Sequence, residues 1–183
     1  MKKESEENKL IFIQDIAIRY FLMIVFAISG FWIFYFIFTP LTVYPVYFLL
    51  SIFFKTTLLN NTINIGDLAI IEIIGACVAG SAYYLFFILN LSTPDINLDK
   101  RVKIFIISFI SFLIINILRI FFLSLVLVKG YSWFDFTHKL FWYLGSTVFV
   151  LLIWFSEVKF FKIREIPFYS DLKKIYKYSS ARR

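Results

Sequence analysis

Three residues of this chain are of types that can act together in acyl transfer: Cys77, Arg119 and His138. Cys77 is the only cysteine, His138 is the only histidine, and Arg119 lies inside the otherwise apolar run "ISFLIINILRIFFLSLVLV". A cysteine thiolate attacks carbonyl carbons, and a neighbouring cation or histidine favours the thiolate over the thiol. Histidine can pass a proton to a leaving group, and a fixed arginine can stabilise the oxyanion of a tetrahedral intermediate. The three residue types therefore suit a reaction on a peptide carbonyl.

Two further polar residues lie close to this set in the sequence. Asn116 precedes Arg119 by one helical turn and can orient its guanidinium from the same helical face. Glu72 is a second ionisable group in apolar surroundings, but it lies five residues before Cys77 and so points toward a different helical face. Two interpretations of Arg119 stay open: it serves a reaction at Cys77, or it forms a structural ion pair with Glu72.

The composition is that of a membrane protein. The chain has 183 residues, of which 61% are hydrophobic and 22% aromatic, and its mean hydropathy is +0.82. Soluble domains are about 45–50% apolar. The length allows a single membrane domain, residues 1–183, and no linker or internal repeat divides it.

Several function classes are disfavoured by what the sequence lacks. It has no cluster of Cys, His and carboxylates at zinc-ligand spacing and no glycine-rich nucleotide fingerprint, so we expect no metal and no cofactor. A net charge of +7 would suit nucleic acid, but the basic residues border apolar runs as membrane anchors do, so we expect no nucleic-acid partner. A thiol-redox protein is disfavoured because there is no second, resolving cysteine.

The apolar runs predict an all-α polytopic membrane bundle of about four transmembrane helices. A span needs about 20 apolar residues. The predicted spans are residues 16–38, 68–91, 102–128 and 138–158. The apolar segment 41–54 is too short for an ordinary span and is predicted to be an interfacial or re-entrant segment.

The distribution of Lys and Arg predicts the orientation of these spans. Fifteen lie in the N-terminal segment, in the loop at 100–103 and in the tail 159–183, whereas three lie in the loops of the opposite side. Because cytoplasmic loops are enriched in Lys and Arg, we expect a multi-pass plasma-membrane protein with both termini cytoplasmic. The basic tail is expected to lie along the inner leaflet.

The same topology brings two of the reactive residues to one depth. Arg119 and Cys77 each lie ten residues from the outer flank of their span, at Lys129 and Asp67 respectively. At about 1.5 Å per residue, both are roughly 15 Å below the outer surface. His138 lies where the last span begins on that side, so the three converge only if the last helix starts about six residues earlier or a water-filled cleft opens outward.

The segments around these residues resemble a known family. "ACVAGSAYYLFFILNL", then "NILRI", then the histidine of "FDFTHKLFWYLG" resemble the exosortase/archaeosortase transpeptidases, over about residues 67–158 or half the chain. These are polytopic membrane enzymes with a Cys–Arg–His or Cys–Arg–Arg site that faces the outer side. Many members have more helices, so the resemblance implies a compact member, of archaeal type.

The resemblance implies roles for the residues and a class of substrate. Cys77 is expected to be the nucleophile, Arg119 the stabilising cation and His138 the proton-transfer residue, with Asn116 and Glu72 in support. Such enzymes are expected to cleave C-terminal transmembrane sorting signals of secreted surface proteins through a thioester and to transfer the protein to an acceptor such as a lipid. The alternative is a non-enzymatic membrane assembly or transport subunit that is held together by an Arg119–Glu72 pair.

Overall fold

The computed structural model describes residues 2–28, 32–131, 133–141 and 145–180. These residues form helices and one small sheet, in the order α1 (Lys2–Ile28), α2 (Trp32–Ser51), β1 (Thr57–Leu59), β2 (Thr62–Ile65), β3 (Ala69–Glu72), α3 (Gly75–Val78), α4 (Gly80–Leu91), α5 (Leu98–Val128), α6 (Phe134–Leu140), α7 (Ser146–Phe160) and α8 (Tyr169–Ser180). The prediction of an all-α bundle is confirmed in its main feature, because most of the described residues are helical. It did not include the small antiparallel sheet, in which β1, β2 and β3 pair in that order.

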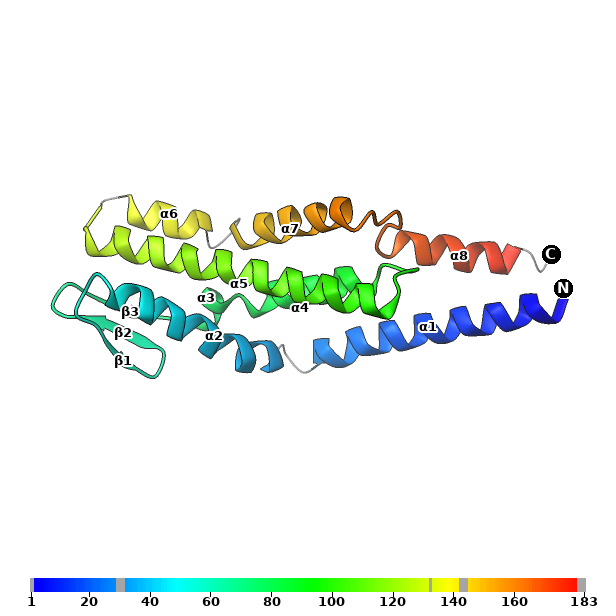
Figure 1. Cartoon of the computed structure of the whole chain (residues 1–183), viewed down its shortest axis with the longest axis horizontal. Helices are drawn as coiled ribbons and strands as arrows, with labels where there is room; N and C mark the ends of the chain where they lie inside the picture. The colour runs from blue at the N-terminus through cyan, green and yellow to red at the C-terminus, as the bar shows by residue number, and fades with distance from the viewer. Residues whose placement is uncertain (1, 29–31, 132, 142–144, 181–183) are drawn as a thin grey trace.

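The helices run back and forth along one long axis (Figure 1). From the end that carries the N-terminus, α1 and α2 follow one another to the opposite end, where the sheet lies. The chain then returns through α3 and α4, goes out again through α5, and comes back through α6 and α7 to α8. Both termini therefore lie at the same end of the molecule, and the sheet lies at the other.

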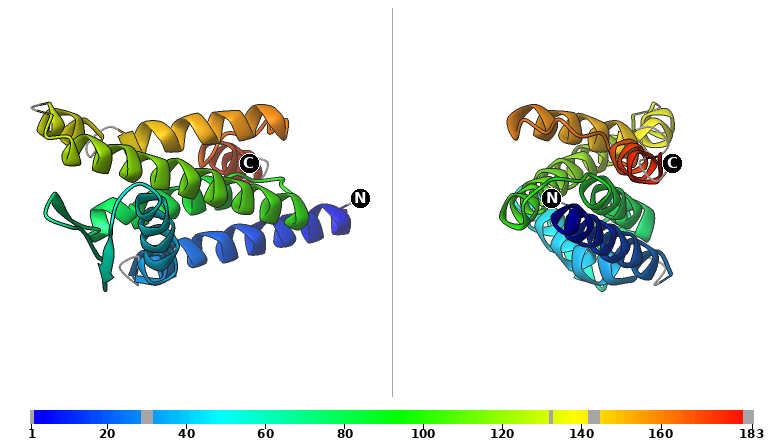
Figure 2. Two further views of the ribbon diagram at one scale, coloured as in Figure 1. Left: turned by 60° about the vertical axis from the view of Figure 1, so that its left-hand side comes forward. Right: turned by 90° about the vertical axis from the view of Figure 1, so that its right-hand side faces the viewer.

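Seen along that axis, α4 and α5 lie between α1 and α2 on one side and α7 and α8 on the other (Figure 2). The core between these layers is aromatic. The rings of Phe38 in α2 and Tyr83 in α4 stack at 3.6 Å between centroids, and Phe112 of α5 meets Tyr83 edge-on at 5.1 Å. Because rings in stacked and edge-on contact hold each other in fixed positions, this core fixes α4 against α2 and α5.

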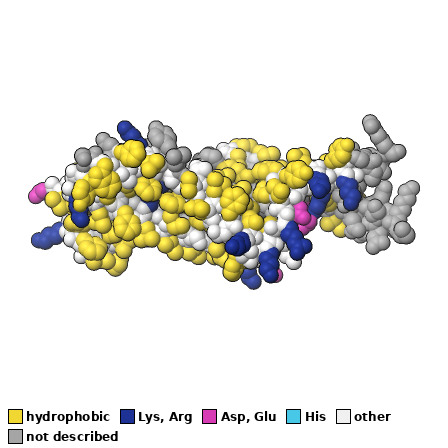
Figure 3. Space-filling model, turned by 90° about the horizontal axis from the view of Figure 1, so that it is seen from above, with side chains coloured by type: hydrophobic (Ala, Val, Ile, Leu, Met, Phe, Trp, Pro, Cys, Tyr) yellow, Lys and Arg dark blue, Asp and Glu magenta, His cyan; other side chains and the backbone are white. Residues whose placement is uncertain are grey.

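The outer surface of the bundle is hydrophobic over much of its length (Figure 3). Lys and Arg side chains gather toward the end with the termini, and a few lie at the opposite end. Among the described residues, three helical segments are long and apolar enough to cross a membrane: Leu10–Ile28 within α1, α2 and α5. On α5, Ile106, Ile110 and Ile114 are each about half exposed, at 52%. Such a surface is stable in contact with lipid and is rare on soluble monomers.

The first predicted span and the segment after it are arranged differently from the prediction. Helix α1 ends at Ile28 and α2 begins at Trp32, so the predicted span 16–38 includes the boundary between two helices. The segment 41–54 is not a separate short segment, because α2 continues through Pro40 and Pro45 to Ser51. Prolines remove backbone hydrogen bonds, but apolar membrane helices tolerate them where neighbouring groups compensate.

The predicted span 68–91 is not one helix either. Its first residues form β3, which pairs with β2 in the sheet, and α3 and α4 follow. The segment "AIIE" is rich in β-branched isoleucine, which favours strands, and a short apolar run has no periodicity that separates strand from helix. The turns beside β2 contain Asn60 and Gly66, whose φ angles of 54° and 50° suit tight hairpin turns.

The last predicted span, 138–158, is also divided. Helix α6 begins earlier than predicted, at Phe134, and ends at Leu140, and α7 begins at Ser146. An earlier start of the last helical segment is one of the two conditions under which His138 can approach Cys77 and Arg119.

Candidate active site

Cys77, Arg119 and His138 line one cleft of about 200 Å³. They come from three separate elements, α3, α5 and α6 respectively, and β3 forms a further part of the wall. The rest of the lining is mainly apolar, with residues such as Leu123 and Phe141. The three residues that the sequence singled out therefore face a common space, although they lie 42 and 19 positions apart along the chain.

Cys77 lies in a single turn of helix just before a sharp change of direction. Helix α3 ends at Val78, its C-cap residue Ala79 has left-handed φ and ψ angles of 58° and 46°, and α4 then begins at Gly80. This break interrupts the regular helical hydrogen bonds of the segment, so the backbone carbonyls of Cys77 and Val78 are available to side chains of other elements. The Cys77 side chain itself is half-buried and its thiol is free.

The small residues around Cys77 do not leave open space beside the thiol. A Cβ atom on Gly80 would lie 2.8 Å from two ring atoms of Tyr35, and one on Gly75 would lie 3.3 Å from the same ring. These glycines admit a tyrosine of α2 to the backbone of α3 and α4. At these two positions the small residues therefore serve tight helix packing.

Arg119 is half-buried and has no carboxylate partner among the described ion pairs. Its Nη1 donates to Ser146 Oγ at 2.9 Å, and its Nη2 donates to the backbone carbonyl of Cys77 at 3.2 Å. The buried Nε has no hydrogen-bond partner in the part of the chain that the structure describes. A guanidinium has five N–H groups, so three of them are not used in these two bonds.

Asn116 lies beside Arg119 on α5 but does not hydrogen-bond to its guanidinium. Its Nδ2 donates to the carbonyl of Cys77 at 2.9 Å and is 3.5 Å from the carbonyl of Val78. Asn116 and Arg119 thus both donate to the backbone of α3. The expected support of the site by Asn116 takes the form of a shared contact with the Cys77 carbonyl.

His138 lies near the end of α6 and is half-buried. Its ring stacks on that of Phe134, one turn earlier, with 5.5 Å between centroids and 8° between planes. The stack restricts the orientation of the imidazole at the wall of the cleft. From the sequence, His138 was expected at the outer surface, above the level of Cys77 and Arg119. In the structure it belongs to a separate short helix, α6, and lines the same cleft as the other two.

Glu72 does not form the ion pair with Arg119 that the sequence left open as an alternative. It is the last residue of β3, its side chain is exposed, and no ion pair between described residues joins the two. The prediction of a buried Glu72 was wrong because it assumed that the segment was helical and inside the membrane. Glu72 nevertheless lines the same cleft as Cys77 and contributes a carboxylate at its edge.

Ser146 is a contact of the site that the sequence analysis missed. It is the first residue of α7 and accepts the hydrogen bond from Arg119. The only signal in the sequence is the pair Gly145–Ser146 within an apolar stretch, and a small polar residue there is typical of many helix starts. Its partner on α5 is 27 residues away and has no local signature.

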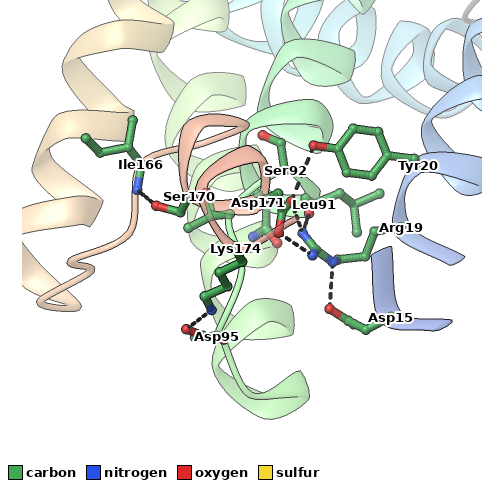
Figure 4. A network of polar contacts seen from close by, with 12 residues as sticks. Asp15, Arg19, Tyr20, Leu91, Ser92, Asp95, Ile166, Ser170, Asp171 and Lys174 are labelled. Carbon is green, nitrogen blue, oxygen red and sulfur yellow. Dashed lines mark hydrogen bonds and ion pairs between the residues drawn. The ribbon is translucent and has the colours of Figure 1, made fainter. Parts of the chain in front are cut away.

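A second polar cluster lies where α1, α4 and α8 meet (Figure 4). Arg19 forms a bidentate ion pair with Asp171, with N–O distances of 2.8 and 2.9 Å. It also donates to Asp15 and to the carbonyl of Leu91. Nearby, Arg101 donates to the carbonyls of Asn90 and Thr93 at the end of α4. Arg19 and Arg101 belong to the basic residues that border apolar runs, which were expected to act as membrane anchors, whereas both are buried.

No family model, no curated protein and no solved structure matches the chain.

Proposed function

We propose that this chain is a membrane cysteine transpeptidase or peptidase of the exosortase/archaeosortase type. The observation that carries the proposal is that Cys77, Arg119 and His138, from three different elements, line one cleft. The substrates are C-terminal transmembrane sorting signals of secreted surface proteins, and the acceptor is a lipid. The protein crosses the plasma membrane four times, with both termini in the cytoplasm.

The position of the cleft supports this topology. The cleft includes residues of β3 and α6, which lie toward the end of the molecule opposite the termini (Figure 1). If the termini are cytoplasmic, the cleft opens on the extracytoplasmic side. Substrates that have been secreted but are still held by a C-terminal transmembrane helix are accessible from that side.

The chemistry proposed for the cleft starts with His138 taking the proton of the Cys77 thiol. The sulfur attacks the carbonyl carbon of the scissile peptide bond, and free N–H groups of Arg119 donate to the oxyanion that forms. His138 then gives its proton to the leaving amine as the C–N bond breaks, which leaves an acyl thioester on Cys77. A hydroxyl of the acceptor attacks the thioester carbonyl and gives its proton to His138, which returns it to the departing thiolate.

One observation favours a second candidate. Arg119 and Asn116 both donate to the Cys77 carbonyl, so both contribute to holding α5 against α3. In a non-enzymatic membrane assembly or transport subunit, this contact would be the whole purpose of Arg119 and the thiol would be dispensable. The structural role then belongs to the backbone carbonyl of residue 77 and not to an ion pair with Glu72.

The experiment that separates the two candidates is co-expression with a candidate substrate. The substrate is a secreted protein of the same genome that ends in one transmembrane helix and a basic cluster, and its size and membrane attachment are followed. We expect Cys77→Ala and Cys77→Ser to abolish processing at unchanged expression. An intermediate bound to the wild-type protein should be released by hydroxylamine, as expected of a thioester.

The matched control is Ser51→Ala, because Ser51 is exposed at the end of α2 and its hydroxyl donates to the Phe48 carbonyl of its own helix. This variant should process the substrate normally. Processing that survives Cys77→Ala would overturn the enzyme proposal and favour the structural role of Arg119.

A further inference from the structure

A second open space lies between α5 and α7, in the half of the bundle nearer the termini. It is a groove of about 530 Å³ that shares no lining residue with the cleft at Cys77. Its walls are mainly apolar, and its polar residues are Ser111 on α5 and Ser156 and Glu157 on α7. An apolar groove with a carboxylate in its wall is unusual on a surface that faces lipid.

Glu157 is buried, with 4% of its surface exposed, and it has no cation partner among the described ion pairs. Ser108 Oγ on α5 lies 2.8 Å from each of its two carboxylate oxygens. A hydroxyl carries one proton and can donate to only one of them. Asp171, the other buried carboxylate of this half, has Arg19 against both of its oxygens. Glu157 therefore lacks the compensation that a buried carboxylate ordinarily has.

We propose that this groove binds a transmembrane helix of another protein that carries a lysine or arginine near its cytoplasmic end, and that Glu157 pairs with this cation. Charge complementarity is the first argument, because the groove presents one buried carboxylate and no cation among its lining residues. The second is its serines, since small side chains let helix backbones approach closely in a membrane. Both Ser111 and Ser156 lie in its wall.

The level of Glu157 along the helix fixes where the partner's cation must be. Glu157 lies one turn before the end of α7 at Phe160, which is followed by the basic tail. A lysine or arginine near the cytoplasmic end of a parallel or antiparallel helix reaches this level, and its long side chain can place the charge beside Glu157. The inference rests on the proposed function for the orientation of the bundle, and it deepens that function because the proposed substrates end in a transmembrane helix and a basic cluster. Binding in the groove does not require Cys77 to react.

The chain's single cysteine makes a direct test simple. In a Cys77→Ala background, Ser156→Cys puts the only thiol in the groove. The protein is reconstituted in lipid vesicles with synthetic single-span peptides of Leu and Ala. Each peptide has one cysteine near its cytoplasmic end and, one turn away, either Lys or Leu. We expect disulfide cross-linking with the Lys peptide to be about tenfold faster than with the Leu peptide, as an intramembrane polar contact allows.

Two control variants locate the effect. Glu157→Gln keeps the size of the side chain and a contact with Ser108, and it should abolish the preference for the Lys peptide. Leu151→Cys is on α7 outside the groove lining and is 43% exposed, and it should cross-link equally with both peptides.

Three outcomes would overturn the proposal. The first is equal cross-linking of the Lys and Leu peptides to Ser156→Cys with Glu157 intact, a comparison that involves no change at Glu157 itself. The second is a preference for Lys that persists in Glu157→Gln. The third is efficient Ser156→Cys dimerisation without peptide, which would assign the groove to a second copy of this chain.

Discussion

Arg19 and Arg119 are both arginines of an apolar helix, and their surroundings differ in almost every respect. Arg19 is 4% exposed and donates to two carboxylates, Asp171 and Asp15, and to one carbonyl. Arg119 is half-buried at the wall of an open cleft and donates to a hydroxyl and a carbonyl, and its Nε has no partner among the described residues. The first site is closed and compensated in charge, and the second is open and is not.

This difference separates an arginine that holds elements together from one that can act on a ligand. A buried cation is expensive unless it is paired, so a chain keeps an unpaired one only where something else compensates for it. In the closed site, the charge of Arg19 is compensated within the protein by the carboxylate of Asp171 in α8. In the open site we propose that it comes during the reaction, from the oxyanion on the substrate.

Arg101 is an intermediate case that sharpens the rule. It has no carboxylate partner among the described ion pairs, yet it donates to the Asn90 and Thr93 carbonyls and to Asn90 Oδ1. These acceptors lie at the carboxyl end of α4, where unpaired carbonyls attract a cation. Arg101 thus caps a helix, and the lack of a carboxylate alone does not mark an active site. The open cleft and the unpartnered Nε distinguish Arg119.

The largest expected effect is on stability, from breaking the closed site. Asp171→Ala leaves Arg19 buried without its bidentate carboxylate partner, and we expect the free energy of unfolding to fall by about 3–5 kcal/mol. Thermal unfolding in detergent micelles measures this. The double variant Arg19→Met with Asp171→Leu removes both charges and should recover most of the loss. If Asp171→Ala unfolds like the wild type, Arg19 is not the structural arginine that we describe.

The second effect is on activity, from altering the open site. Arg119→Lys keeps the charge but loses the planar set of donors, and we expect processing to slow by about 10²–10³-fold, as when an oxyanion donor is removed. Unfolding should change little, because the Cys77 carbonyl keeps its bond from Asn116. Rates of substrate processing and unfolding temperatures are measured on the same preparations. Arg19→Lys is the matched control, with the opposite result expected: a lower unfolding temperature and normal processing below it.

The sequence was sufficient for the helical bundle and for three reactive residues that line the cleft. Hydropathy and chain length predict apolar helices long enough to cross a membrane, although three of the four predicted spans are divided in the structure. The sequence singled out Cys77, Arg119 and His138, because the chain has one cysteine and one histidine and because an arginine in an apolar run is costly. The structure shows in addition that these three residues line one cleft. Local sequence patterns do not indicate which residues of different elements lie close together.

Other features depend on long-range contacts and could not be predicted. The burial of Arg19 rests on Asp171, 152 residues later, and the partner of Arg119 on α7 is 27 residues away. The sheet was missed because its isoleucines fit a strand and a membrane helix equally well. Because β3 is a strand, Glu72 lies at its exposed end and not inside a membrane helix. The alternative ion pair between Glu72 and Arg119 therefore does not form among the described residues.

The third effect comes from the close packing that places Cys77. Gly80→Ala puts a Cβ atom 2.8 Å from the Tyr35 ring, and we expect a loss of about 1–3 kcal/mol in stability together with slower processing. Ser81→Ala is the control, since the neighbouring Ser81 is exposed and should tolerate the change. In a Tyr35→Leu background the penalty of Gly80→Ala should become smaller. An equal penalty in both backgrounds would show that the ring is not the obstacle.

The smallest effect concerns the backbone at the break between α3 and α4. Ala79 has a left-handed conformation, with φ at 58°, which an L-residue with a Cβ adopts at a cost of roughly 1–2 kcal/mol and glycine adopts without strain. Glycine also has more conformational freedom in the unfolded chain, which offsets part of this relief of strain. We therefore expect Ala79→Gly to raise the free energy of unfolding by about 0.5–1 kcal/mol. Ala82→Gly, inside the regular helix α4, should lower it by about 1 kcal/mol. Opposite signs for two Ala-to-Gly changes three residues apart would establish that the backbone beside Cys77 is strained in the folded protein. Two losses of equal size would mean that α3 and α4 form one continuous helix in solution, and the Cys77 carbonyl would then have no need of Asn116 and Arg119.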